Sequence, residues 1–344
     1  MDNESKVVNG EKLAEGEPKV EIRSQSGLTD VALAMRSPRV RLIALLVAGV
    51  AFAVVPPMLP PYPLTLLNQV VIYAIFAMSV DLLLGYTGLA SLGHAAYFGL
   101  AAYVVGIGTT LHQWSFWVCL PVGVLLAAAV GAVFGLIAIR ALGVYFLMIT
   151  LALGMVVWGT AFRWVSLTQG DNGISGVPRP TLATGWVLEQ QRPFYYLCVT
   201  FFLLAFAILY LIVRSPFGLS LQGIRETERR MRALGYNVWL HKYLAFVISA
   251  AFAGLAGVLW AYYQGFVSPV ETHLITSVEG VLMVAVGGSG TLVGPVLGAG
   301  IIVFVKNMLS LYTKRWLLIL GILYITVIAL APKGIMGAIR GERR

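Results

Sequence analysis

One stretch of this sequence constrains the fold more than any other. Between Leu42 and Phe162 the only Asp, Glu, Lys or Arg residues are Asp81 and Arg140. Soluble domains carry about 25% charged residues, whereas this chain carries 11%. A helix that crosses a bilayer needs about 20 mostly apolar residues, and the stretch contains several runs of that kind. The chain therefore belongs in a membrane.

The apolar runs predict an all-α, polytopic bundle of about ten transmembrane helices. This membrane domain occupies residues 36–340, and a polar segment, 1–35, precedes it. That segment has nearly balanced charges and few aromatic residues, so we expect a largely disordered cytoplasmic tail. The predicted spans are 42–59, 66–85, 92–110, 116–139, 143–162, 195–213, 243–263, 272–286, 291–309 and 316–332.

The net charge of +9 indicates orientation rather than nucleic-acid binding. Basic residues gather in short segments beside apolar runs, where the positive-inside rule places them on the cytoplasmic side. Three arginines between 36 and 41 precede the first span, and six basic residues lie in loop 214–242. We therefore predict both termini and loop 214–242 in the cytoplasm, and loop 163–194 outside. The expected location is a bacterial inner membrane.

The sequence shows neither a nucleotide-hydrolysis motif nor a group of residues spaced as in a catalytic centre. No Gly-Lys pair occurs, so the phosphate-binding loop of nucleotide hydrolases is absent. The four histidines lack metal-ligand spacing, and we expect no cofactor. Ser91 and His94 have no orienting carboxylate nearby in sequence. We expect Ser91 to cap the third span and His94 to hydrogen-bond within the bundle.

Polar and glycine-rich positions inside the apolar region are candidates for a translocation path. Ionisable residues within a membrane are functional hypotheses by default. Glu279 lies deep in its span, whereas Asp81 is close enough to a span end to reach the interface and Lys306 can extend toward it. Two segments read as broken helices, 85–94 and 287–295, and each either lines a path or forms an interfacial turn. The path candidates are Ser91, His94, Glu279, Gly287, Gly288 and Gly290.

The predicted cytoplasmic loop contains a short amphipathic helix at 219–234. Leu221, Ile224, Met231 and Leu234 share one side at helical spacing, and Gly235 and Asn237 end the helix. A basic helix of this kind either lies on anionic lipid or docks in the groove of a partner protein.

Six segments resemble the permease subunits of branched-chain amino acid ABC importers, in particular the larger of the two paired permeases. The similarity covers about residues 40–340. It is much less specific for the solute than for the family. The segments are Leu84–Leu89 and Ser91–Gly99 around the second and third spans, Gly143–Ala152 in the fifth span, Thr168–Ile174 in the external loop, and Glu279–Val284 with Gly287–Pro295.

The resemblance implies an assembly of separate subunits. Two permeases, often different, would sit over two cytoplasmic ATPases, and a periplasmic binding protein would deliver a small polar solute. Segment 219–235 corresponds to the family's coupling helix, although arginines replace the usual alanines after Glu228. The implied ATPase-coupling residues are Leu221, Ile224, Glu228, Met231, Leu234 and Gly235.

Other functions stay open at this point. Importers of urea, short amides or aromatic acids look similar to the same family. A secondary transporter driven by ions would need charged groups at mid-membrane and two related halves, which we do not detect clearly.

Overall fold

The structure is a computed structural model that describes residues 60–180, 191–312 and 334–339, with isolated positions between 315 and 325. The described residues belong to one unit, Ala48–Arg344. The predicted tail, the predicted span 42–59 and nearly all of 316–332 lie outside the described residues. The other eight predicted spans all fall on helices.

Seven of the described helices are long and apolar enough to cross a bilayer. This confirms an all-α polytopic membrane fold, whereas the count of ten is not confirmed. The seven are α3 (Pro61–Asp81), which the π-helical segment η2 (Leu82–Thr87) continues, α4 (His94–Leu111), α5 (Phe116–Ala138), α6 (Val144–Arg163), α8 (Gln191–Arg214), α11 (Val238–Gln264) and α13 (Val293–Tyr312).

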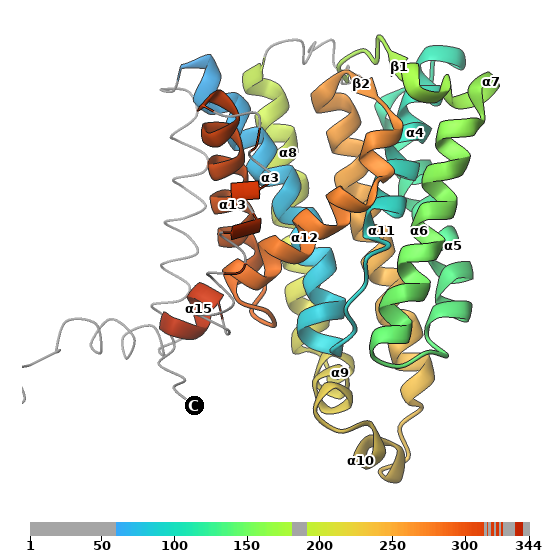
Figure 1. The fold of residues 1–344 in the computed structure, drawn as a ribbon, viewed down its shortest axis with the longest axis vertical. Helices are drawn as coiled ribbons and strands as arrows, with labels where there is room; N and C mark the ends of the chain where they lie inside the picture. Colours follow the sequence, from blue (N-terminus) through green and yellow to red (C-terminus); the bar gives the residue numbers. More distant parts are fainter. Residues whose placement is uncertain are drawn as a thin grey trace, which may run out of the picture. The chain divides into compact units, whose positions relative to one another are not determined.

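The predicted span 272–286 corresponds to a shorter helix, α12 (Leu274–Gly287), which has 14 residues. At 1.5 Å per residue it is about 21 Å long, less than the roughly 30 Å of a hydrocarbon core. Figure 1 shows it running obliquely beside the longer helices. By length alone it is therefore too short to span the full hydrocarbon core.

The core of the bundle consists of α3, α4 and α11. Most residues of these three helices are buried, whereas α5, α6, α8 and α13 bury a third or less of theirs. Gly131 lets α5 pack closely against α11, because a side chain there would collide with Ala250 of α11. Lipid provides little hydrophobic drive between helices, so close backbone approach of this kind holds them together.

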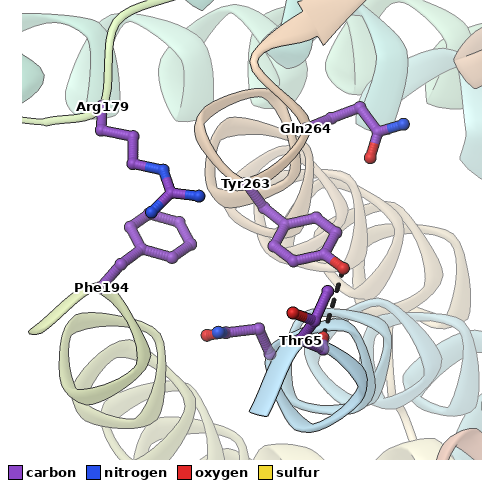
Figure 2. A pocket seen from close by; sticks show the side chains of 6 residues that line it. Thr65, Arg179, Phe194, Tyr263 and Gln264 are labelled. Carbon is purple, nitrogen blue, oxygen red and sulfur yellow. Dashed lines mark hydrogen bonds between the residues drawn. The ribbon is translucent and has the colours of Figure 1, made fainter. Parts of the chain in front are cut away.

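Short elements occupy the two ends of the bundle. At one end, β1 (Ile174–Ser175) pairs antiparallel with β2 (Phe266–Val267), and α7 (Val165–Thr168), η3 (Gly170–Asn172) and η4 (Pro269–Thr272) surround them. The Tyr263 hydroxyl donates to the Thr65 carbonyl and joins α11 to α3 at 3.2 Å (Figure 2). At the opposite end lie α9 (Pro216–Glu226) and α10 (Glu228–Ala233), as Figure 1 shows. A further helix, α15, spans Gly334–Ile339.

Candidate functional site

The two segments that the sequence marked as broken helices meet each other beside α9. Arg225 of α9 donates through Nη1 to the Gly85 carbonyl in η2. The Gly290 amide donates to Asp81 Oδ1 at 2.7 Å, and the Leu292 amide donates to Asp81 Oδ2 at 3.3 Å. We call these five residues the Asp81 hub. The hub connects α3, the loop before α13 and the cytoplasmic loop predicted from the sequence.

Asp81 differs from its sequence-based interpretation. It does not reach an interface, because η2 extends the helix beyond it to Thr87 and its side chain is fully buried. Both carboxylate oxygens instead accept hydrogen bonds from backbone amides just before α13 begins. Both amides precede Val293, the first residue of α13, so Asp81 holds the loop that leads into this helix.

The loop between α12 and α13 needs its glycines. Gly288 and Gly290 have φ values of 109° and 77°, which side chains rarely permit. A Cβ atom on Gly287 would overlap the Gly294 carbonyl. The segment from Gly287 to Gly294 therefore combines a backbone turn with a close approach of α12 and α13. A role for Gly287, Gly288 or Gly290 in lining a path stays a prediction.

His94 occupies the place expected of it, whereas Ser91 does not. His94 Nε2 lies 2.8 Å from Ser249 Oγ, and Ser249 donates to the Ser79 carbonyl at 2.6 Å, so His94 connects α4, α11 and α3. The Ser91 hydroxyl accepts from the Gly93 amide, which precedes the helix. The cap on α4 comes from another helix, because Ser277 Oγ accepts from the Ala95 amide at 2.8 Å. The expectation that Ser91 caps this helix is wrong.

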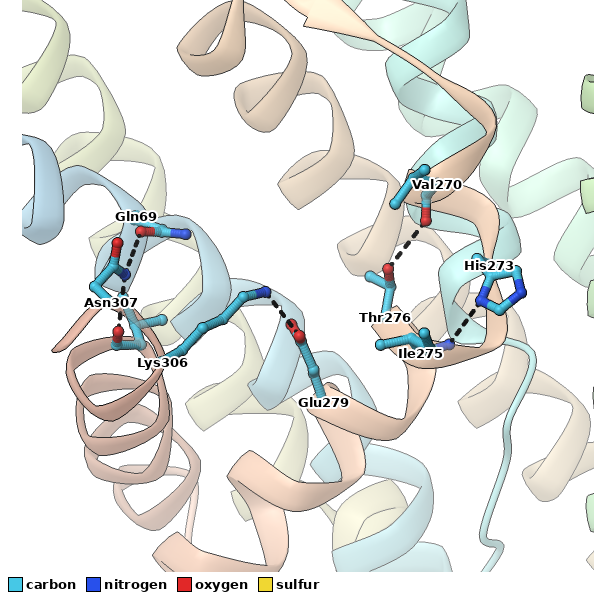
Figure 3. A network of polar contacts seen from close by, with 9 residues as sticks. Gln69, Val270, His273, Ile275, Thr276, Glu279, Lys306 and Asn307 are labelled. Atoms are coloured by element: carbon cyan, nitrogen blue, oxygen red, sulfur yellow. Dashed lines mark hydrogen bonds and ion pairs between the residues drawn. The ribbon is translucent and has the colours of Figure 1, made fainter. Parts of the chain in front are cut away.

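Glu279 has a partner that the sequence did not indicate. Lys306 Nζ of α13 lies 2.7 Å from Glu279 Oε1 of α12, as Figure 3 shows. The Glu279 side chain is 5% exposed, and Lys306 therefore pairs inward rather than extending to the interface. Asn307 donates to Gln69 Oε1 at 2.9 Å and attaches the same stretch of α13 to α3. A part for Glu279 in the path stays a prediction.

The predicted single helix at 219–234 consists of two helices. Thr227 adopts an extended backbone, with φ −156° and ψ 98°, and separates α9 from α10. Gly235 ends α10 with φ 86°, as expected. Asn237 instead begins α11, because its side chain accepts a hydrogen bond from the Leu240 amide.

Most of the apolar side chains expected to face a partner are already covered by this chain. Leu221 and Ile224 are buried, and Met231 packs with Ile224 and Val238 of α11. The expectation that these three side chains fill a groove on an ATPase does not fit their burial. The side chains that stay exposed on this loop include Leu219, Leu234, Tyr236, Arg229, Arg230 and Arg232.

Glu228, expected among the residues that contact the ATPase, forms ion pairs within this chain. It forms an ion pair with Lys242 of α11, whose side chain is 4% exposed, and a second pair with the exposed Arg232 at 3.4 Å. The buried pair fixes α10 against the first turns of α11. Within the described part of the chain, no group of three or more potential metal ligands occurs.

Comparison with protein families gives a match at residues 62–328. The matching family is described as "Branched-chain amino acid transport system / permease component". The chain belongs to this family. The resemblance that the motifs carried is therefore confirmed over most of the chain.

Individual relatives agree with this membership. The chain is 30% identical to the high-affinity branched-chain amino acid transport system permease protein LivM of Escherichia coli K12, over 88% of this chain and 75% of LivM. It is 26% identical to the LivH permease protein of Salmonella typhimurium, over 77% of this chain and 91% of LivH. It is also 26% identical to the guanosine ABC transporter permease protein NupQ of Bacillus subtilis, over 39% of this chain and 44% of NupQ. No solved structure matches the chain.

Proposed function

We propose that this chain is a permease subunit of an ATP-driven importer that carries branched-chain amino acids across the inner membrane. The family match over residues 62–328 carries this proposal, and the similarity to LivM over 88% of the chain supports the solute class. Separate subunits would hydrolyse ATP, because the sequence has no phosphate-binding loop. A periplasmic binding protein would deliver the solute.

A second permease subunit completes the proposed membrane unit. The chain is similar to both LivM and LivH, which are named as permease proteins of the same transport system. Two related but different permeases in one system support a heterodimer. The apolar outer faces of α5, α6, α8 and α13 would then contact either lipid or the second permease.

The α9–α10 end is the proposed receiver of ATPase movement. Its exposed Leu234, with the neighbouring arginines, offers an apolar contact surrounded by charge, a combination that favours specific docking. From there, Arg225 of α9 reaches Gly85, and Asp81 reaches the loop before α13. A displacement of α9 would therefore reach α3 and α13 through direct hydrogen bonds. The basic character of loop 214–242 supports a cytoplasmic location, with both termini on the same side and the β1–β2 end outside.

Two alternatives remain distinguishable from this proposal. The partial similarity to NupQ, whose name specifies guanosine, makes other small polar solutes of the same family a second candidate. A secondary transporter driven by protons would use a buried carboxylate such as Glu279. That carboxylate is already paired with Lys306, which favours a structural role.

Uptake in reconstituted vesicles tests the proposal. The chain, the second permease, both ATPases and the binding protein would be combined, and labelled L-leucine uptake measured with each component omitted in turn. We expect uptake only with the full set and ATP. Leucine uptake by this chain alone, driven by a proton gradient, would refute the proposal, and uptake of guanosine but not leucine would change the solute class.

A further inference from the structure

We propose that a cavity between α3, α8, α11 and the segment that contains Arg179 binds a small apolar α-amino acid. The permease itself would then hold the solute. The inference rests on the proposed function and adds a site to it. The cavity has a volume of about 210 Å³ and is lined by Thr65, Asn68, Arg179, Phe194, Tyr263 and Gln264. Pockets for drug-sized ligands measure about 300–1,000 Å³, so this one suits a smaller molecule.

Arg179 offers a binding group for a carboxylate. Figure 2 shows its guanidinium beside the Phe194 ring, on the side that faces Tyr263. A guanidinium presents a planar fork of donors that matches both oxygens of a carboxylate. A neutral sugar or nucleoside would make no such pair.

Asn68 offers a binding group for an ammonium. It lines the cavity, its side chain is buried, and its Nδ2 donates to the Leu64 carbonyl at 3.3 Å. Among the described residues its Oδ1 atom has no hydrogen-bond partner. A buried acceptor without a donor is costly, and an ammonium supplies three donors. The Tyr263 hydroxyl donates to Thr65 and keeps lone pairs that can accept as well.

Phe194 and Tyr263 supply the apolar part of the site. Phe194 is buried at the start of α8, and the Tyr263 ring faces the cavity from the end of α11 (Figure 2). Aromatic rings of this kind bury aliphatic side chains and also attract cations. A carboxylate partner, an ammonium acceptor and an apolar wall together match an α-amino acid with an aliphatic side chain.

The position of the cavity fits a site for incoming solute. Its lining residues come from the starts of α3 and α8 and the end of α11, which lie toward the end of the bundle that carries β1 and β2, opposite α9 and α10 (Figure 1). Gln264, one of the lining residues, is exposed at that end. In the proposed orientation this is the outer end, where a binding protein would release its ligand.

Equilibrium binding to the full transporter complex in nanodiscs, without binding protein or ATP, tests this inference. The probe is radiolabelled L-leucine, and the competitors are L-leucinamide, which lacks the carboxylate, and 4-methylpentanoate, which lacks the amine. We expect saturable leucine binding and at least tenfold weaker competition by each truncated analogue. Arg179→Gln and Asn68→Leu should each lower leucine affinity about tenfold or more.

Arg192→Gln is the matched control, because Arg192 is an exposed arginine near the start of α8 that does not line the cavity. It should bind leucine as the unaltered chain does. If Arg179→Gln does not assemble, Gln264→Trp, at the exposed edge, should block the cavity and abolish binding. Leucine uptake by the same complex with its binding protein separates the two claims. Absent uptake counts against the proposed function, whereas absent leucine binding, or unchanged binding by both Arg179→Gln and Asn68→Leu, overturns the cavity site.

Discussion

Gly287 and Gly294 bring the end of α12 and the start of α13 so close that no side chain fits between them. A new Cβ atom at Gly287 meets backbone rather than the end of a flexible side chain, so the helices must separate. Overpacking of this kind lowers the free energy of unfolding by about 1–3 kcal/mol. At the residue scale, the glycines of this loop set helix spacing as well as backbone conformation.

Gly287→Ala should therefore destabilise the chain and lower uptake, although alanine favours helices. Gly159→Ala in α6 is the control, because a Cβ atom there meets nothing within 4 Å. That change should leave stability unchanged or raise it by up to about 1 kcal/mol. Thermal unfolding midpoints of the two purified variants measure the difference. Equal midpoints would contradict the close contact at Gly287.

Asp81→Ala should destabilise the loop before α13. The change removes both acceptors and leaves the amides of Gly290 and Leu292 without partners, at about 1–3 kcal/mol each. Asp81→Asn keeps one carbonyl oxygen and should cost less. Thermal unfolding together with limited proteolysis between residues 287 and 293 measures the effect. An Asp81→Ala chain as stable as Asp81→Asn would argue against the hub.

At the element scale, α9 and α10 form a hairpin-like extension that rests on α11. Met231 and Ile224 hold it through apolar contact, and Glu228 holds it through Lys242. Its exposed large apolar side chains are those of Leu219, Leu234 and Tyr236. Arg225 connects the extension to the Asp81 hub through its hydrogen bond to the Gly85 carbonyl.

The two ion pairs of Glu228 should differ in strength. Arg232→Gln removes an exposed pair, which is worth about 0–1 kcal/mol. Glu228→Gln leaves the buried Lys242 ammonium unpaired, and breaking a buried pair in this way costs more, up to about 3–5 kcal/mol. Proteolysis rates within residues 214–237 should rise strongly for Glu228→Gln and little for Arg232→Gln. Similar rates for both variants would show that the pair with Lys242 does not fix α10.

The sequence predicted the positions of the helices better than the contacts between them. The apolar runs predicted the positions of eight described helices, because the length of an apolar run can be read directly from the local sequence. The extended Thr227 was not predicted, since no glycine or proline marks it. Periodicity showed that Leu221, Ile224 and Met231 share a face, but not that this chain's own α11 covers part of it. The partners of Asp81 lie 209 and 211 residues away, beyond any local pattern.

At the scale of the whole molecule, the bundle has a buried centre and an apolar periphery. Residues such as Leu125, Tyr145 and Leu211 expose apolar side chains on α5, α6 and α8. In water such surfaces would aggregate, whereas lipid or a second permease covers them without cost. The two ends of the bundle differ in charge, because basic residues gather in loop 214–242, which contains α9 and α10, at the end opposite β1 and β2.

Cysteine labelling should assign these ends to opposite sides of the membrane. Both native cysteines, Cys119 and Cys198, are buried, so an exposed substituted cysteine is labelled selectively. Asp171→Cys should react with an impermeant maleimide added outside intact cells, and Arg230→Cys only after permeabilisation. The reverse pattern would contradict the proposed orientation.

The coupling of ATP hydrolysis to uptake in the Leu234→Asp complex tests whether the α9–α10 end receives movement from the ATPase. Leu234 is 66% exposed, so the change should preserve folding while placing a charge in the proposed contact with the ATPase. Leu219→Asp, at 63% exposure on α9, reports on the neighbouring surface. We expect the Leu234→Asp permease to assemble stably but to lose ATPase co-purification and at least tenfold of leucine uptake. Normal co-purification with normal uptake per ATP hydrolysed would contradict it.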